Sequence, residues 1–307
     1  RGAAEVVIVD NRSAASRVPG KLRRLSGVSV VRNPRNHGFA RAVNRGGRLS
    51  RGEWVLLLNP DVTVPPGFLD AVLDAAQRWP AVDPTAGVVG FQLRNPDGTR
   101  QASAGPFPTL LSSVARLVLP RGRRKCAHQS LTARRPVPWV TGGCLLVRRD
   151  CFDAVGGLDE TFFLYYEDVD FCRRAAARGW RVWFDPALEV THHWPLHARR
   201  VPPPLRLVTR HALLTYARRH WSAWQANLLS GAVWLEAGSW RRRPAASRRR
   251  PGASARCGGW SATWHRGGRG RRRRASGTRP RSFTPSRPSR TGEPVSSRFH
   301  VPSDTHP

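Results

Sequence analysis

The run Val55-Leu56-Leu57-Leu58-Asn59-Pro60-Asp61 decides the fold. Its four consecutive apolar residues are typical of a strand that is buried on both faces, and the polar residues after them end the strand. A run of the same kind, Val6-Val7-Ile8-Val9, ends at Asp10. Further apolar runs lie at 28–31 and 87–91. Continuous runs, rather than alternating ones, indicate parallel strands covered by helices.

Helical patterns lie between these strands. Residues 38–49, and the segment that follows Pro65-Pro66, carry apolar side chains at helical spacing. Strands and helices that alternate in this way predict βαβ units, hence an α/β domain with a mostly parallel sheet. In such sheets a ligand binds outside the carboxyl ends of the strands, which is where Asp10 and Asp61 fall.

Five ordered motifs resemble the family 2 glycosyltransferases of the GT-A fold, over roughly residues 4–200. Within that family the Asn-Pro-Asp run is most similar to rhamnosyltransferase-like members. The resemblance implies a Rossmann-like α/β domain, with a mostly parallel sheet and flanking helices. It also implies transfer of a sugar, with inversion, from a nucleotide-diphosphate donor to an acceptor hydroxyl. The motifs are Val6 to Ser13, Asn33 to Gly46, Leu56 to Asp61, Trp139 to Cys144 and Gly156 to Asp170.

The resemblance and the composition divide the chain into three parts. We expect a GT-A domain over 1–204, amphipathic helices over 205–237, and a tail over 238–307. The tail holds half of the formal net charge of +32. Its Arg/Pro/Ser/Gly-rich composition predicts disorder. The same composition fits an out-of-frame translation of GC-rich DNA, a hypothesis that a single clean reading frame through codon 238 would overturn.

The family begins with a further strand and a Thr-Tyr-Asn-like turn that floors the base pocket. This chain starts after that point and contains no methionine. We therefore expect it to be truncated at the N-terminus, with an exposed edge on its first strand. A fragment that binds nucleotide-sugar without turning it over is an alternative to an active enzyme.

Asp61 is the first candidate site residue. A diphosphate leaving group needs a divalent cation, and Mg²⁺ or Mn²⁺ prefers hard carboxylate oxygens. The resemblance gives Asn59 and Asp61 to the donor and adds a histidine to the metal site. For that second metal ligand we favour His192 over His193. The structural alternative for Asp61 is a turn aspartate.

Asp168 is the candidate general base, with Glu167 as its neighbour or substitute. Transfer to a hydroxyl requires a carboxylate that takes the proton as the oxygen attacks. Acids in the first turn of a helix also complement its dipole, and that structural explanation suits Asp170. It does not explain an acid pair placed directly after the aromatic run Phe162 to Tyr166.

The resemblance implies further contacts with the donor. Asp10 is expected to accept an N–H of the nucleotide base, or instead to cap the turn at Ser13. A glycine at a helix N-terminus lets the backbone approach a phosphate. The remaining candidates are Asn36, Gly38 and Asn44 for the ribose and diphosphate, and Gly142 and Gly143 for the sugar and acceptor.

The implied partners are a dTDP- or UDP-sugar and a glycan or lipid-linked acceptor. We expect a cytoplasmic protein whose basic surface favours an anionic membrane face. No run approaches 18 apolar residues, so no membrane-spanning helix is expected. For residues 205–237 we prefer packing against the main domain to a membrane-surface role. A nucleic-acid-binding function driven by the tail is disfavoured, because its Arg runs lack interleaved aromatic residues.

Overall fold

The central sheet of the domain has seven strands. We analysed a computed structural model that describes residues 4–13, 20–118, 131–194 and 202–241. The strand order is β3-β10-β5-β11-β4, with β6 paired to β5 and β8 paired to β11. The bounds are β3 Trp54–Leu58, β4 Val62–Thr63, β5 Ala86–Arg94, β6 Arg100–Gln101, β8 Arg135–Pro136, β10 Cys144–Arg148 and β11 Arg181–His192.

The directions of these strands confirm the α/β class and correct one detail of it. The sheet is mixed, not mostly parallel, because β10 runs antiparallel to both β3 and β5 while β5 and β11 are parallel. Strands β3, β5 and β11 therefore share one direction, as the βαβ pattern predicts. Cys144, the first residue of β10, lies opposite Leu58, the last of β3. The chain thus enters β10 from the carboxyl end of the sheet, which forces the reversed direction.

Two further sheets of two strands each lie outside the central sheet. β1 (Val6–Asp10) pairs in parallel with β2 (Val28–Arg32), and β7 (Ala104–Gly105) pairs with β9 (Trp139–Val140). A short 3-10 turn, η1 (Gly20–Arg24), precedes β2. Within the described ranges β2 is the one strand partner of β1.

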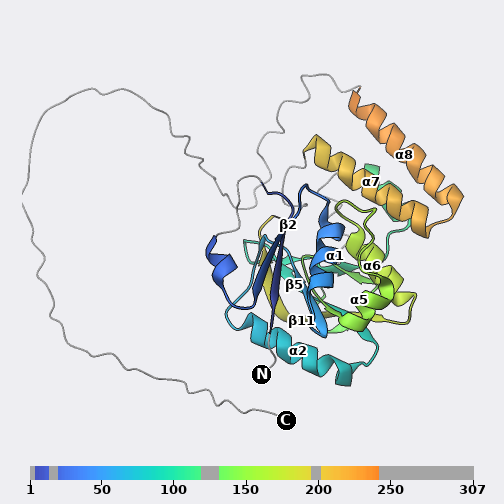
Figure 1. Cartoon of the computed structure of the whole chain (residues 1–307). Helices are drawn as coiled ribbons and strands as arrows, with labels where there is room; N and C mark the ends of the chain where they lie inside the picture. Colours follow the sequence, from blue (N-terminus) through green and yellow to red (C-terminus); the bar gives the residue numbers. More distant parts are fainter. Residues whose placement is uncertain (1–3, 14–19, 119–130, 195–201, 242–307) are drawn as a thin grey trace, which may run out of the picture. The chain divides into compact units, whose positions relative to one another are not determined.

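Helices cover both faces of the sheet (Figure 1). One core cluster joins α1, α5 and α6 to one face, and the other joins α2 to the opposite face. Along β10, Leu145 and Val147 enter the first cluster, whereas Cys144 and Leu146 enter the second. This alternation is the period of two that a strand covered on both faces requires. The bounds are α1 Phe39–Leu49, α2 Phe68–Val82, α5 Arg149–Val155 and α6 Glu167–Ala176.

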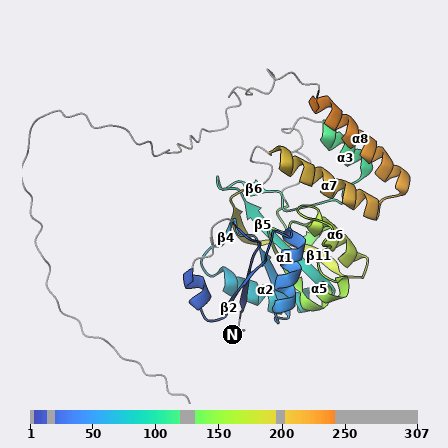
Figure 2. The same cartoon turned by 45° about the horizontal axis from the view of Figure 1, so that its top comes forward.

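Three further helices pack together beside α6 (Figure 2). They are α3 (Leu110–Val118), α7 (Pro203–His220) and α8 (Ala223–Arg241), and Leu229 of α8 is fully buried among them. The helices predicted over 205–237 are thus α7 and α8, and α8 ends four residues inside the predicted tail. Residues 242–307 lie outside the described ranges.

The C-terminal helices are tied to α6 through a buried carboxylate. Asp170 of α6 is fully buried and accepts from Arg174 Nε at 2.7 Å. Its other oxygen lies 2.7 Å from His220 Nε2 of α7. These contacts give Asp170 a structural role in joining α6 to α7. No helix in the described part of the chain is both long enough and apolar enough to cross a membrane.

Candidate active site

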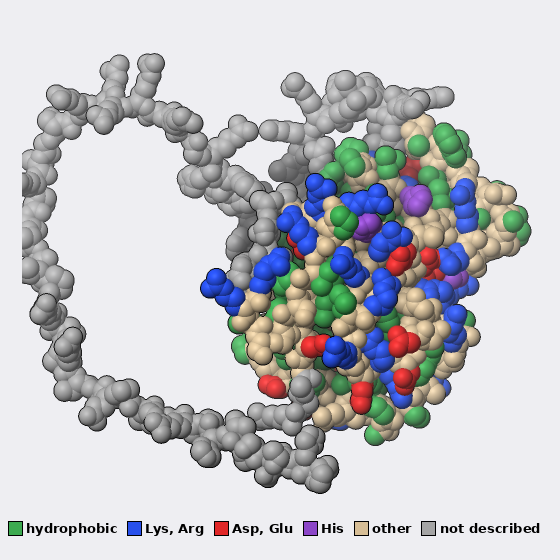
Figure 3. All heavy atoms as spheres, in the orientation of Figure 1, with side chains coloured by type: hydrophobic (Ala, Val, Ile, Leu, Met, Phe, Trp, Pro, Cys, Tyr) green, Lys and Arg blue, Asp and Glu red, His purple; other side chains and the backbone are tan. Residues whose placement is uncertain are grey.

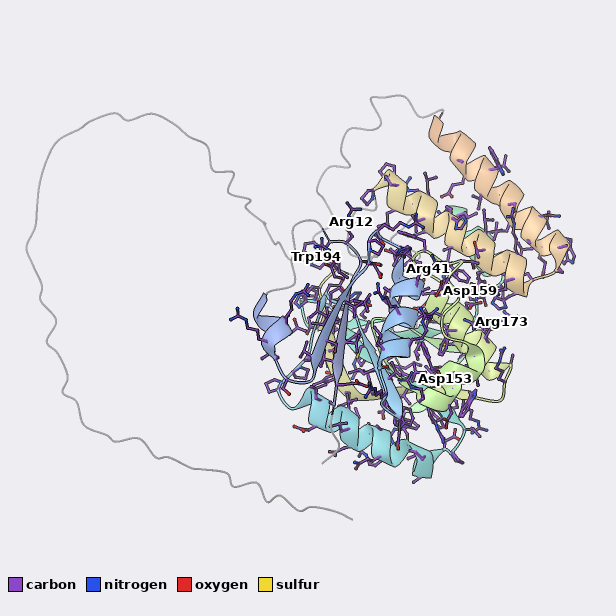
Figure 4. All side chains as sticks on the ribbon, in the orientation of Figure 1. Arg12, Arg41, Asp153, Asp159, Arg173 and Trp194 are labelled. Atoms are coloured by element: carbon purple, nitrogen blue, oxygen red, sulfur yellow. The ribbon has the colours of Figure 1, made fainter. Side chains whose placement is uncertain are left out.

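The carboxyl ends of β3 and β11 bring the candidate metal ligands together. Asp61 follows β3, and His192 is the last residue of β11. The two meet because β4, directly after Asp61, pairs with β11 so that Val62 lies opposite His192. In Figure 4, Arg12, just after β1, and Trp194, just after β11, mark this end of the sheet, on the side of α7 and away from α2.

Asp61 and His192 face each other with the spacing of two ligands of one ion. His192 Nε2 lies 3.3 Å from Asp61 Oδ2, and both side chains are mostly buried. Two ligands about 2.1 Å from one octahedral ion, at right angles, lie about 3.0 Å apart. The pair therefore fits a divalent cation. No group of three His, Cys, Asp or Glu side chains in the described ranges could hold one, so such an ion would depend on donor oxygens for its remaining ligands.

Gln101 orients the imidazole of His192. The amide nitrogen and oxygen of Gln101 lie 3.1 and 3.2 Å from His192 Nδ1. When the oxygen accepts the Nδ1–H, the Nε2 lone pair points toward Asp61, which is the tautomer that a metal ligand needs. The backbone of Gln101 is held in place, because Ser103 Oγ donates to the Gln101 backbone carbonyl oxygen at 3.0 Å. Sequence reasoning missed Gln101, since it lies in a two-residue strand with no apolar pattern.

Replacing Gln101 with Ala should weaken metal activation by about 10- to 100-fold, the usual effect of losing a ligand's hydrogen-bond partner. Gln101→Glu should restore most of the loss, because a carboxylate also accepts the Nδ1–H. The measurement is the Mn²⁺ concentration that gives half-maximal sugar transfer. A purely structural Gln101 would instead lower the melting temperature without changing that concentration.

Asn59 carries an unsatisfied polar atom beside this pair. Its side-chain oxygen is buried without a hydrogen-bond partner, while its backbone N–H donates to the Gly143 carbonyl at 3.0 Å. A buried acceptor of this kind is destabilising unless a ligand supplies a donor or a cation. Asn59 is therefore available to a ligand that binds next to Asp61.

Asp168 lies at the start of α6, with its carboxylate held by backbone N–H groups. Gly142 N donates to Oδ2 at 2.9 Å, and Val169 N donates to Oδ1 at 2.8 Å. Burial raises the pKa of Asp168 above its ordinary value, and the two backbone hydrogen bonds offset part of that rise. A carboxylate with a raised pKa accepts a proton more readily near neutral pH.

Glu167, its neighbour, is buried and has a carboxyl oxygen without a hydrogen-bond partner. Burial, and secondly the negative charge of Asp168, raise the pKa of Glu167 well above its ordinary value. Two adjacent carboxyls in one low-dielectric environment cannot both ionise easily. The pKa of Glu167 is raised further than that of Asp168, so Asp168 is the more readily ionised of the two.

The Gly142-Gly143 step joins the two halves of the site. Gly142 donates to Asp168, and Gly143 accepts from Asn59. A Cβ at Gly142 would lie 3.5 Å from Asp168 Cβ, and one at Gly143 would lie 3.0 Å from Leu93 Cδ1. The step therefore sets the position of Asp168 relative to the residues that follow β3. The predicted contact of Gly142 and Gly143 with the sugar and the acceptor stays a prediction.

Asp10 caps the turn at Ser13, the structural alternative to contact with the nucleotide base. Its Oδ1 accepts from Ser13 N at 2.8 Å, and its Oδ2 lies 3.4 Å from Arg32 Nε. The hydrogen bond from Ser13 is the main cause that lowers the pKa of Asp10. The neighbouring Asn11, which sequence reasoning missed, donates to the Gly38 carbonyl at 2.8 Å.

Gly38 lets the backbone of Phe163 approach α1 closely. The predicted contact of Gly38 with a phosphate stays a prediction. Its φ is +88°, and a Cβ there would lie 2.5 Å from the Phe163 carbonyl oxygen. The next residue, Phe39, donates its N–H to that same oxygen at 2.8 Å. Asn36, which is exposed, accepts from Gly38 N at 2.9 Å. These contacts fix the entry of α1 against the loop before α6.

Gly38→Ala should destabilise the fold by about 3 kcal/mol or more, because it combines a backbone conformation restricted to glycine with a steric clash. Gly67→Ala is the matched control. Its φ is +72°, yet no atom lies within 4 Å of the added Cβ, so about 1 kcal/mol is expected. Thermal unfolding measures both, and equal losses would show that the contact with Phe163 is loose.

Asn44, an expected donor contact, forms side-chain hydrogen bonds within the protein. It is buried in α1, and its amide nitrogen donates to the Leu158 carbonyl at 2.7 Å and to Glu160 at 3.1 Å. Its oxygen accepts from Leu158 N at 2.8 Å. All of its polar atoms are thus bonded within the protein. Asn44 thus joins α1 to the loop before α6, and its contact with the donor stays a prediction.

Known proteins resemble this chain in sequence and fold. The family described as glycosyltransferase like family 2 matches residues 2–226. The N-acetylglucosaminyl-diphospho-decaprenol L-rhamnosyltransferase of Mycobacterium tuberculosis is 36% identical over 243 residues, 73% of this chain and 78% of that protein. Rhamnosyltransferase WbbL of Escherichia coli K12 is 26% identical over 141 residues, 46% of this chain and 52% of that protein.

The fold also matches a solved structure, that of GalNAc-T7 with UDP, GalNAc and Mn²⁺. The TM-score is 0.50 at 20% identity, over 70% of this chain and 42% of that one. At that identity the match shows a common fold alone. The match to the family covers most of the chain, from β1 to the start of α8, and includes both halves of the site. The chain therefore belongs to the family 2 glycosyltransferases.

Proposed function

We propose that this glycosyltransferase inverts the anomeric centre and moves a rhamnose-like sugar from a dTDP- or UDP-linked donor. The acceptor is a hydroxyl of a lipid-linked glycan. The observation that carries the proposal is the placement of the Asp61–His192 pair and the Asp168 carboxylate around one backbone step, Gly142-Gly143. A diphosphate held at the Asp61–His192 pair and an acceptor hydroxyl held at Asp168 would flank the same sugar.

The residues of the chain divide the chemistry between them. A divalent cation, when bound, neutralises the charge that develops on the leaving diphosphate. Asp61 and His192 would hold that cation, and Gln101 keeps His192 in the tautomer that a metal ligand needs. Asp168 takes the proton from the acceptor hydroxyl as its oxygen attacks the anomeric carbon. The raised pKa of Glu167 disfavours a second negative charge beside Asp168.

The names of two relatives support the choice of substrates. Both are rhamnosyltransferases, and one is named for a diphospho-decaprenol acceptor. The run that ends in Asn59-Pro60-Asp61 also resembles rhamnosyltransferase-like members of the family. We place the reaction in the cytoplasm, at the inner face of the cell membrane, because a lipid-linked acceptor is presented there.

A panel of donors tests the proposal. The chain is incubated with Mn²⁺, a short-chain N-acetylglucosaminyl-diphospho-lipid, and dTDP-rhamnose, UDP-glucose, UDP-N-acetylglucosamine or GDP-mannose in turn. Transfer from dTDP-rhamnose above the others is expected. Preference for another donor would overturn the sugar assignment, and binding of a donor without any turnover would identify an inactive fragment.

A further inference from the structure

Two consecutive tyrosines just before α6 have a left-handed backbone. The φ angles of Tyr165 and Tyr166 are +74° and +68°. Residues other than glycine seldom adopt this conformation, which costs free energy and persists only where the surrounding structure holds it in place. Glu167 and the proposed base, Asp168, follow directly in the sequence. A strained turn therefore fixes the point at which α6 begins.

Helix α7 supports this turn. The ring of Tyr166 packs against the ring of Tyr216, with centroids 5.7 Å apart. Tyr216 is fully buried, and its ring also contacts His220 and Trp221, with centroids 4.7 and 6.3 Å away. Tyr166 packs against both apolar clusters that contain residues of α7. Tyr216 is thus a fixed surface on which the left-handed turn rests.

Further contacts hold α7 against α6. Asp170 Oδ1 lies 2.7 Å from His220 Nε2. Arg173, labelled in Figure 4, donates to the Tyr216 hydroxyl at 3.0 Å and to the His220 carbonyl oxygen at 3.4 Å. Arginine side chains lie over much of the surface in Figure 3, with scattered acidic side chains among them, and exposed pairs of that kind contribute little. The contacts of Asp170 differ, because this carboxylate is fully buried.

Helix α7 and the backbone at Gly142 contact opposite sides of the start of α6. Tyr166, Asp170 and Arg173 are spaced by four and three residues, so they share one side of the helix. Asp168 lies two residues from the first two, about 200° around the helix axis. On that side its Oδ2 accepts from Gly142 N at 2.9 Å. A displacement of α7 would therefore move the Asp168 carboxylate relative to Gly142.

We propose that Tyr216 is a positioning residue for the general base. It supports the turn formed by Tyr165 and Tyr166, and this turn sets the place of the Asp168 carboxylate at the start of α6. This inference deepens the proposed function and rests on the role of Asp168 given there. It gives the C-terminal helices, which lie outside the central sheet, a part in proton transfer from the acceptor hydroxyl.

Substitutions at Tyr216 test the proposal through the rate of sugar transfer. Tyr216→Leu removes the supporting ring, so kcat should fall by roughly 10- to 100-fold, the usual cost of a small misplacement of a catalytic group. The KM of the donor should not change. Tyr216→Phe keeps the ring and should retain most of the rate. An unchanged kcat in Tyr216→Leu, or a parallel rise in the KM of the donor, would overturn the proposal.

The matched control breaks another aromatic pair of α6. Phe152 of α5 packs against Phe171, with ring centroids 6.0 Å apart. Phe152→Leu should lower the melting temperature, as Tyr216→Leu does, and leave kcat unchanged. All rates are measured well below the melting temperature of every variant. An equal loss of kcat in the control would show that Tyr216 contributes to stability alone, and would overturn the proposal.

A double-mutant cycle shows whether Tyr216 acts through Asp168. In the Asp168→Asn background, Tyr216→Leu should have little further effect on single-turnover transfer, because no base is left to misplace. The same loss in both backgrounds would overturn the positioning role and leave the base in place. Full transfer by Asp168→Asn alone would instead overturn the base, and the positioning role with it. If Tyr216→Leu does not fold, Arg173→Gln, which loses both hydrogen bonds to α7, takes its place in the cycle.

Substitutions at Tyr165 test the turn without any sugar transfer. Glycine adopts a φ of +74° without strain, whereas alanine does not. Both substitutions remove the ring of Tyr165, so the difference between them reports on the backbone. Tyr165→Gly should therefore melt at a higher temperature than Tyr165→Ala. Equal melting temperatures, or a higher one for Tyr165→Ala, would show that the turn is not left-handed and would overturn the proposal.

Discussion

Asp168→Asn should lower the rate of sugar transfer by about 10²–10⁴-fold, the usual share of general-base catalysis. Asparagine cannot take the acceptor proton, yet its oxygen can still accept a backbone N–H from Gly142. Donor affinity and metal affinity should therefore change little. Single-turnover transfer and calorimetric donor binding measure the two effects separately. Asp153→Asn, at an exposed acid of α5 labelled in Figure 4, is the matched control and should leave both unchanged.

The pH dependence should carry the signature of the raised pKa. Asp168 must be deprotonated to act as a base, so activity should fall at a pH above the ordinary aspartate range as the solution is acidified. Stability has the opposite sign. Between the unfolded and the raised folded pKa values of Asp168 and Glu167, the folded state binds more protons, so stability falls as pH rises through that window.

This sign separates a catalytic role from a structural one. Asp168→Asn removes the ionisation that burial opposes, so the variant should be as stable as the unaltered chain at acidic pH and at least as stable at neutral pH. A melting temperature that drops at neutral pH, or a parallel loss of donor binding, would show that Asp168 holds the fold or the donor.

Asp61→Ala should lower sugar transfer by roughly 10³-fold or more and should also weaken donor binding. The side chain is one of two residues that fit a divalent cation, and such a cation supplies several kcal/mol of charge stabilisation to a leaving diphosphate. The backbone carbonyl of Asp61, which accepts from His193 N at 2.9 Å, is unaffected by the substitution. Asn59→Ala should have a smaller effect, because it removes a neutral amide.

The matched test at the second ligand uses adjacent histidines. His192→Ala should resemble Asp61→Ala in its loss of Mn²⁺ activation. His193→Ala should not, because His193 Nε2 lies 2.7 Å from Thr63 Oγ1 and its side chain is exposed. Titration of activity with Mn²⁺ measures both variants. Full activity of the unaltered chain in excess EDTA would show that sugar transfer does not depend on a divalent cation.

The sequence predicts the strands and helices of the α/β domain well, because each carries its own apolar pattern. The direction of β10 cannot be predicted from its apolar pattern, because a strand that is buried on both faces has the same pattern in either direction. The pairing of Val62 with His192, which brings Asp61 and His192 together across 131 residues, also depends on the folded sheet. It was expected only through the resemblance to a family.

Residue type alone does not show which residues Gly38 and Asn44 contact in the fold. Gly38 and Asn44 have the properties expected of donor-binding residues, a permissive backbone and a versatile amide. Their partners are instead Phe163, Leu158 and Glu160, in a loop more than 110 residues away. Nothing in the pattern around α1 shows which loop will pack on it. For the same reason Gln101, which no motif contains, was missed although it contacts His192.

The anomeric configuration of the product tests the central claim most directly. The proposed function has one carboxylate base, Asp168, whose Oδ2 accepts from Gly142 N. A single base predicts a single displacement, in which the acceptor oxygen attacks as the diphosphate leaves. The product of transfer from a donor of known configuration, read from its NMR couplings, should therefore show the inverted linkage. A product with the retained linkage would contradict the account, because retention requires a second displacement or a covalent sugar–enzyme intermediate.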